Sequence, residues 1–314
     1  MAKAKQVPAI SDAADPFRWA ADVLLLRFDE VVNFGGAVTV EWNVNAVHDM
    51  RVALRRLRSA LRDLSPMIDG KSIRRIKAAL KKIAATLGKV RDLDVAIIAM
   101  EGLSVETRND PNKTGIDALI AKLRIQRENG HAGIRKTFKS ISVEGLRNGF
   151  LQQIEGPRCR RHLSRPADLF EVGRSVIDTR LDLLCSASNA LFTPFDGARL
   201  HELRIAAKRL RYALELFESG WPDKYGGFVK EISKLQAHLG EVHDCDLWID
   251  KLSRRLTEKD SRKMAKSPIS TAAAWLLSKF VEKRGREYGK ALGLWLEWTA
   301  NDFVERLRTR TAAL

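Results

Sequence analysis

A basic segment headed by histidine occurs twice in this chain of 314 residues. The first copy, at 48–61, reads HDMRVALRRLRSAL, and the second copy, at 201–214, reads HELRIAAKRLRYAL. The cationic positions that coincide are His48 with His201, Arg51 with Arg204, Arg55 with Lys208, Arg56 with Arg209 and Arg58 with Arg211. This agreement in phase indicates an internal duplication, and a duplicated chain is expected to fold as two similar halves.

The duplication extends beyond the basic segment. Residues 87–95 read LGKVRDLDV and residues 239–247 read LGEVHDCDL. The matched pairs are Gly88 with Gly240, Asp92 with Asp244, and Asp94 with Asp246. Each copy then continues through a polar loop into another long helical pattern, in which Arg127 and Arg284 occupy comparable positions. Each half therefore shows the same order of elements.

The spacing of apolar residues predicts an all-α protein, because helical periodicity is common and strand-like alternation is scarce. Helices are predicted at about 17–33, 43–64, 72–100, 115–139, 168–191, 197–219, 224–256 and 270–308. Breaks are predicted at Gly35–Gly36, at Ser65–Pro66, and at 106–115, 220–222 and 259–268. We predict two four-helix bundles, 16–155 and 168–308, related by a pseudo-two-fold axis and joined by a basic linker at 156–167.

The composition favours a polyanionic partner. Lysine and arginine number 55 against 39 acidic residues, for a net charge of +16. Such an excess is typical of proteins that bind nucleic acid, an anionic membrane surface or another polyanion. The three cysteines form no CxxC pair, which argues against a zinc site or a disulfide framework. Without a signal-peptide pattern or a long apolar run, the chain is predicted to be soluble and cytoplasmic.

Helical geometry places the matched cations of each copy on one side of a helix, within roughly 80° of one another in the first copy. The first stripe is His48, Arg51, Arg55, Arg58 and Arg62, and the second stripe is His201, Arg204, Lys208 and Arg211. Arg56 and Arg209 lie off these stripes. A solvated helix face is the plain alternative, but arginine offers planar, bidentate contacts to phosphate that a solvated surface does not need. The stripes therefore predict phosphate binding.

The histidines and aspartates leave other readings open. His48 and His201 could be structural, metal-binding or phosphoaccepting, but no HxxxH, HExxH or nearby cysteine accompanies either one. We interpret both as anion contacts whose imidazole pKa a bound phosphate raises. The DxD pairs could bind metal, but they are better interpreted as carboxylates that orient the surplus arginines. Gly70-Lys71-Ser72 resembles the end of a phosphate-binding loop, but Ser65 stands where its first glycine should be.

The paired basic segments, each followed by LGxxxDxD, resemble the motifs of CHAD domains over about 17–308. That resemblance implies two four-helix bundles with a basic central groove, binding of inorganic polyphosphate, and association with polyphosphate granules. Carried onto this chain, the implied contacts are His48, Arg51, Arg55, Arg58, His201, Arg204, Lys208, Arg211 and Tyr212. Lys82 and Lys234 are predicted to extend this surface, and the predicted binding set also includes Arg62 of the first stripe together with Arg91, Arg127 and Arg284. The copies differ where Ser59 matches Tyr212 and where Arg91 matches His243.

From the residues and the resemblance we predict a stand-alone, non-enzymatic polyphosphate-binding protein. No cofactor, metal or membrane partner is predicted. The triphosphate-tunnel catalytic domain that accompanies some relatives has no counterpart in the sequence. Two alternatives stay open: a basic nucleic-acid-binding protein, and an enzyme that processes polyphosphate or carries a phosphohistidine.

Overall fold

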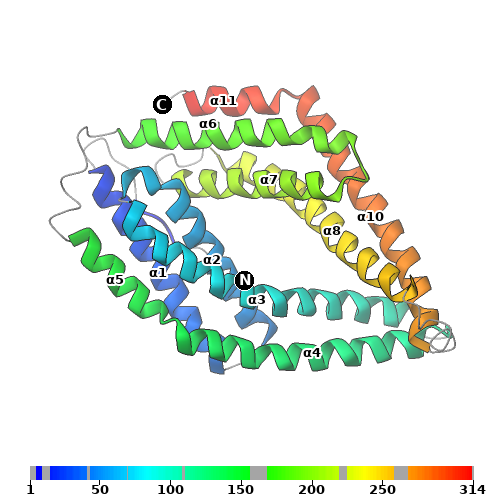
Figure 1. Ribbon diagram of the computed structural model, residues 1–314. Helices are drawn as coiled ribbons and strands as arrows, with labels where there is room; N and C mark the ends of the chain where they lie inside the picture. The colour runs from blue at the N-terminus through cyan, green and yellow to red at the C-terminus, as the bar shows by residue number, and fades with distance from the viewer. Residues whose placement is uncertain are drawn as a thin grey trace. The chain divides into compact units, whose positions relative to one another are not determined.

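The computed structural model describes residues 5–8, 15–40, 43–68, 70–107, 110–155, 168–218, 225–257 and 268–312. Within these ranges the regular elements are α-helices and two short 3-10 helices, which confirms the predicted all-α class (Figure 1). They are α1 (Pro16–Val40), α2 (Val44–Asp63), η1 (Ser65–Met67), α3 (Gly70–Glu106), α4 (Lys113–Ser140), α5 (Val143–Glu155), α6 (Leu169–Ala187), η3 (Ser188–Phe192), α7 (Gly197–Phe217), α8 (Gly226–Thr257), α10 (Pro268–Ala300) and α11 (Phe303–Ala312). No helix among them is both long enough and apolar enough to span a membrane.

The chain divides into two compact units. Unit 1 comprises Met1–Val95, Ile125–Val176 and Tyr212–Tyr225, and unit 2 comprises Ala96–Arg124, Ile177–Arg211 and Gly226–Leu314. Helices α3, α4, α6 and α7 therefore contribute residues to both units. The predicted linker at 156–167 lies outside the described residues, so the division into halves at that point stays a prediction.

In unit 1, α2 forms because its sequence supplies both an N-cap and a continuous apolar side. The Asn43 side chain accepts a hydrogen bond from the Ala46 backbone N–H at 2.7 Å, which satisfies one of the free donors at the start of the helix. The apolar residues beside the cationic stripe are at most 1% exposed: Val47, Leu54, Leu57, Leu61 and Leu64. Helix α1 packs against α2 and α5. Burial on one side leaves the cationic side of α2 to face outward from the core.

Unit 2 is built on the long antiparallel pair α8 and α10, which lie side by side (Figure 1). Trp248 of α8 stacks on Phe280 of α10, with ring centroids 6.0 Å apart. The apolar side of α7 is buried like that of α2, since Leu203 and Leu210 are fully buried. Both copies therefore expose the predicted cationic side by burying the same neighbouring side.

Two predicted boundaries are wrong. Helix α1 continues through Gly35–Gly36, where a break was predicted, because Val38 beyond them is fully buried. Burying a valine gains about 1.5 kcal/mol or more, which offsets much of the roughly 1 kcal/mol that each glycine costs a helix. The last predicted helix is instead divided at Asp302, whose φ of 49° lies in the left-handed region. At this turn the rings of Trp298 and Phe303 stack, with their centroids 4.0 Å apart.

The sequence analysis also missed α5. This helix is short and contains two glycines, so its apolar periodicity is weak. Ser142 lies just before it, and its hydroxyl oxygen accepts a hydrogen bond from the Gly145 backbone N–H at 2.9 Å. Phe150 is buried on α5 and its ring centroid lies 5.5 Å from that of Phe28 on α1. With α5 and α11 included, each predicted half contains five described α-helices where four were expected.

Candidate functional site

The first cationic stripe lies on α2 within unit 1. His48, Arg51, Arg55 and Arg62 are partly exposed and Arg58 is exposed, so each can be reached from solvent. Desolvation by burial and the charge of Arg91 lower the pKa of His48 below its ordinary value. His48 is therefore largely neutral at pH 7 in the absence of an anion. Its environment is cationic enough that a bound phosphate would favour protonation.

Arg51 lies against Gly88, the glycine of the LGxxxDxD signature in the first copy. A Cβ added to Gly88 of α3 would lie 2.9 Å from Nη1 of Arg51. The same relation recurs in unit 2, where a Cβ on Gly240 of α8 would lie 3.5 Å from Nε of Arg204. In each copy, therefore, the guanidinium of the first arginine of the stripe, Arg51 or Arg204, lies against the backbone of the neighbouring helix at the glycine.

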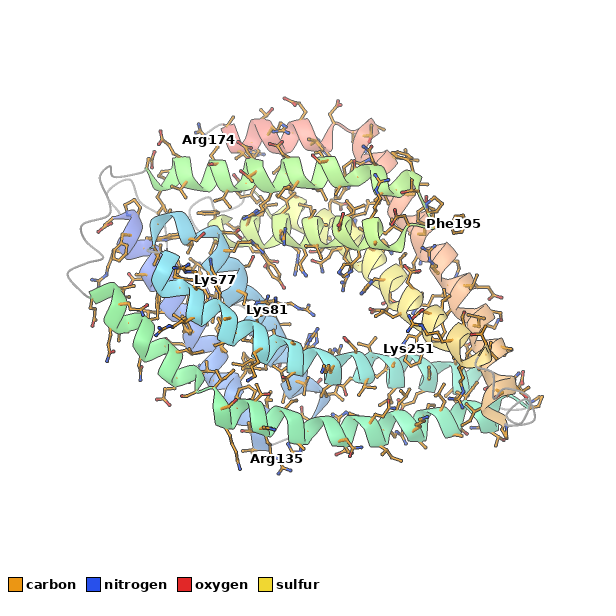
Figure 2. The ribbon with its side chains drawn as sticks, viewed as in Figure 1. Lys77, Lys81, Arg135, Arg174, Phe195 and Lys251 are labelled. Carbon is orange, nitrogen blue, oxygen red and sulfur yellow. The ribbon has the colours of Figure 1, made fainter. Side chains whose placement is uncertain are left out.

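The C-terminal end of the first stripe gathers additional charge. Burial and the charge of Arg62 lower the pKa of Lys77 on α3, while Asp63 acts in the opposite direction. Figure 2 labels Lys77 and Lys81 on the same helix. The prediction missed Lys77 because its counterpart by the repeat alignment is Val229, so the duplication gives no signal for it.

Arg62 is held within its own unit. Its Nε and Nη2 donate to the carboxylate of the buried Asp63 at 3.0 Å, and Nη2 also donates to Ser59 at 2.6 Å. Asp63 thereby offsets part of the charge at this end of the stripe. In the second copy the residue that matches Arg62 is Glu215. A carboxylate therefore accompanies this end of both stripes.

The second stripe lies on the part of α7 that belongs to unit 2. Its residues are His201, Arg204, Lys208 and Arg211. The ring centroids of His201 and His243 lie 4.1 Å apart. Burial first, and then the positive charges of His201 and Arg204, lower the pKa of His243 to about 4. The pKa of His201 is lowered by burial and by Arg204 and Lys208. Arg211 donates from Nε to Oε1 of Gln236 at 3.1 Å.

The last aspartate of each signature forms an ion pair with the predicted arginine of the following helix. Arg127 Nε donates to Oδ1 of Asp94 at 2.6 Å in unit 1, and Arg284 Nε donates to Oδ1 of Asp246 at 2.5 Å in unit 2. The Arg127 and Arg284 side chains are only 12% and 13% exposed, and Asp94 is fully buried. Asp94 and Asp246 therefore form ion pairs of the kind predicted, whereas their role in orienting the arginines stays a prediction. Arg127 and Arg284 are joined to other helices and are the less accessible members of the predicted set.

Other predicted residues differ in accessibility. Lys82 and Lys234 are exposed on α3 and α8, and Lys234 also pairs with Glu231 at 2.7 Å. Arg91 is partly exposed, whereas Tyr212 is 7% exposed and falls in unit 1. Across the described ranges, no three His, Cys, Asp or Glu residues are grouped so as to hold a metal ion.

Comparison with known proteins identifies the family of the chain. The sequence model of the CHAD domain family matches residues 22–253, well over half of the chain. The chain belongs to the CHAD domain family. The structure of a CHAD domain from the plant Ricinus communis is similar with a TM-score of 0.65 and 20% sequence identity, covering 98% of this chain and 96% of that one. PptA from Streptomyces chartreusis is similar with a TM-score of 0.67 and 13% identity, covering 90% of this chain and all of the other.

At these identities the structural likeness establishes the CHAD fold alone. No curated protein matches the chain. The family assignment confirms the resemblance on which the polyphosphate prediction was based. The individual contacts on α2 and α7 stay predictions that rest on the geometry described above.

Proposed function

We propose that this CHAD protein binds inorganic polyphosphate through the cationic stripes of α2 and α7, without enzymatic turnover. The observation that carries the proposal is the repetition of the same exposed or half-exposed cations, in the same helical phase, in both compact units. Membership of the CHAD family, which is associated with polyphosphate, supports the choice of polyanion.

The chemistry of the stripes suits a ligand of repeating phosphates. Successive cations three and four residues apart repel one another by a few tenths of a kcal/mol per pair, and an anion relieves that repulsion. Arginine can bind phosphate oxygens in a bidentate manner, which makes the contact directional. Because a backbone charge is recognised, binding should be strong at low salt and weaken as salt rises. We further propose that the protein acts in the cytoplasm at polyphosphate granules.

A titration with long-chain polyphosphate tests the proposal directly. We expect the variant Arg51→Glu with Arg204→Glu to lose binding, because each substitution places a carboxylate inside a stripe. The matched control is Arg18→Glu with Arg124→Glu, which changes the net charge equally at exposed positions outside the stripes. The control should retain most of the affinity, and both variants should keep the helical circular-dichroism spectrum of the wild type. Equal binding by the two double variants would show that net charge alone attracts the ligand.

The two alternative functions, nucleic-acid binding and enzymatic processing of polyphosphate, can be distinguished by two assays. A nucleic-acid-binding protein would hold a labelled DNA or RNA duplex when polyphosphate is added at equal phosphate concentration, whereas the proposed protein would release it. An enzyme would liberate phosphate from polyphosphate in the presence of Mg²⁺ or Mn²⁺. Sustained release that exceeds one phosphate per protein would overturn the non-enzymatic part of the proposal.

A further inference from the structure

A glycine inside a helix normally weakens it, and yet both copies of the LGxxxDxD signature contain one. Gly88 lies well inside α3 and Gly240 inside α8. Glycine in a helix interior is less favourable than alanine because it has more backbone freedom to lose. A reason for the glycine must therefore come from its surroundings.

Gly88 and Gly240 differ from several other helical glycines in what an added Cβ would meet. Among the described glycines, Gly102, Gly227, Gly285 and Gly289 have open space where a Cβ would be. A Cβ on Gly115 would lie 2.0 Å from the backbone oxygen of Pro268 and one on Gly130 would lie 2.7 Å from Cγ2 of Val90, so these two glycines permit a close approach of neighbouring segments. Gly88 and Gly240 instead each meet an arginine of a predicted stripe.

We propose that Gly88 is a positioning residue that lets the guanidinium of Arg51 lie across α3 in the orientation used to bind phosphate. A Cβ there would lie 2.9 Å from Nη1 of Arg51, a separation that real Cβ atoms essentially never show. The atom it meets is the far end of a long, flexible side chain. Alanine at position 88 therefore displaces the Arg51 guanidinium and leaves the helix packing intact.

Gly240 lies beside Arg204 in unit 2 in a similar way, but with more room for a side chain. A Cβ there would lie 3.5 Å from Nε and 3.9 Å from Nη2 of Arg204, which is ordinary van der Waals contact. The geometry thus predicts an unequal response of the two copies to the same substitution. Alanine should disturb Arg51 in the first copy much more than Arg204 in the second.

The experiment compares Gly88→Ala, Gly240→Ala and Gly102→Ala with the wild type, and it rests on the proposed binding of polyphosphate. Gly102→Ala is the matched control, because it lies on the same helix α3 as Gly88 and its Cβ would meet nothing. We expect all three variants to melt at or above the wild-type temperature, since alanine favours the helix. Gly88→Ala should weaken polyphosphate binding about ten-fold, as expected for the loss of one charge-assisted hydrogen bond. Gly102→Ala should bind as the wild type does, and Gly240→Ala should show a smaller loss than Gly88→Ala.

A double-mutant cycle distinguishes positioning from a general effect of the substitution. Once Arg51→Ala has removed the side chain, adding Gly88→Ala should cause no further loss of affinity, because the two residues act through one contact. A full additional loss in that background, or wild-type affinity of Gly88→Ala alone, would falsify the proposal. Failure of Gly88→Ala to fold would also overturn it, since the added methyl should meet only a mobile side-chain end.

A readout that needs no ligand separates this inference from the proposed function. The Nε–H resonance of Arg51, assigned through its disappearance in Arg51→Lys, should shift in Gly88→Ala and stay in place in Gly102→Ala. Absence of polyphosphate binding by the wild type would refute the proposed function, while the resonance would still decide whether Gly88 positions Arg51. An unmoved resonance in Gly88→Ala would refute the positioning role whatever the ligand.

Discussion

At the scale of single residues, burial and then the neighbouring cations favour the neutral form of the stripe histidines, His48 and His201, and of His243 beside His201. The pKa of His243 lies at about 4, and those of His48 and His201 are also lowered. The charged groups that act on His243 are His201, Arg204, Lys208 and, in the opposite direction, Asp246. An anion bound beside these groups would reverse the balance and allow the rings to take up protons.

This arrangement predicts that the free protein loses stability as the pH falls. The unfolded His243 binds a proton at about pH 6.5 and the folded one only near pH 4, so the unfolded state holds more protons in between. Stability should therefore decrease from about pH 7 down to pH 4, by about 2 kcal/mol after allowance for the solvent that reaches the half-buried ring. Chemical denaturation at a series of pH values measures the effect.

His243→Gln is the control for the acid-dependent loss, because glutamine has no proton to gain. The variant should show a shallower decrease between pH 7 and pH 4 than the wild type. An identical pH profile in both proteins would mean that other groups dominate the acid sensitivity.

Polyphosphate at pH 5.5 should raise the melting temperature more than it does at pH 7.5, since the bound anion favours the protonated imidazoles.

At the scale of helices, the pair of Arg127 and Asp94 joins α4 to α3 inside unit 1. Asp94 is fully buried and Arg127 is 12% exposed. Breaking a buried ion pair from one side leaves an uncompensated charge, so Arg127→Ala should destabilise the protein by about 3 kcal/mol. Thermal or denaturant unfolding of the purified variant measures this loss.

Arg124→Ala provides the surface control on the same helix. Its partner Glu101 and Arg124 itself are both well exposed, and such pairs contribute about 1 kcal/mol or less. Replacing both Asp94 and Arg127 by leucine should recover much of the lost stability, because no charge is then left buried. If Arg127→Ala were as mild as Arg124→Ala, the pair could not be an important link between the two helices.

Most helices could be predicted from the sequence because a repeated apolar period survives in every long element. The boundaries at Gly35–Gly36 and at Asp302 could not, since burial of Val38 and stacking of Trp298 on Phe303 are tertiary effects. The phase of the stripes was predictable because it depends on one helix at a time. The approach of His243 to His201 and the place of Lys77 required knowledge of which helices are neighbours.

At the scale of the whole molecule, the chain carries a net charge of +16 and has one cationic stripe in each of its two compact units. If both stripes neutralise phosphates of the ligand, residues of both stripes should contribute to the slope of log affinity against log salt concentration. Arg51→Ala and Arg204→Ala should each reduce the slope by about 0.7, the contribution of one phosphate contact in a flexible polyanion. Titrations of polyphosphate at four or more salt concentrations, on the order of 0.05 to 0.3 M, give these slopes.

Arg18→Ala is the control for the slopes, because it removes one positive charge from an exposed position on α1 outside the stripes. Its slope should equal that of the wild type. An unchanged slope in Arg204→Ala would exclude the second stripe from the complex, and the first stripe would then account for the binding alone.

The unequal room at the two glycines has a consequence for how this duplicated gene product can change over generations. Alanine at position 240 would meet Arg204 at an ordinary contact distance, whereas alanine at position 88 would displace Arg51. A mutation from glycine to alanine should therefore be nearly neutral in the second copy and harmful in the first. Under selection for function, we expect inherited variation at this pair of sites to accumulate at position 240 and to be rare at position 88.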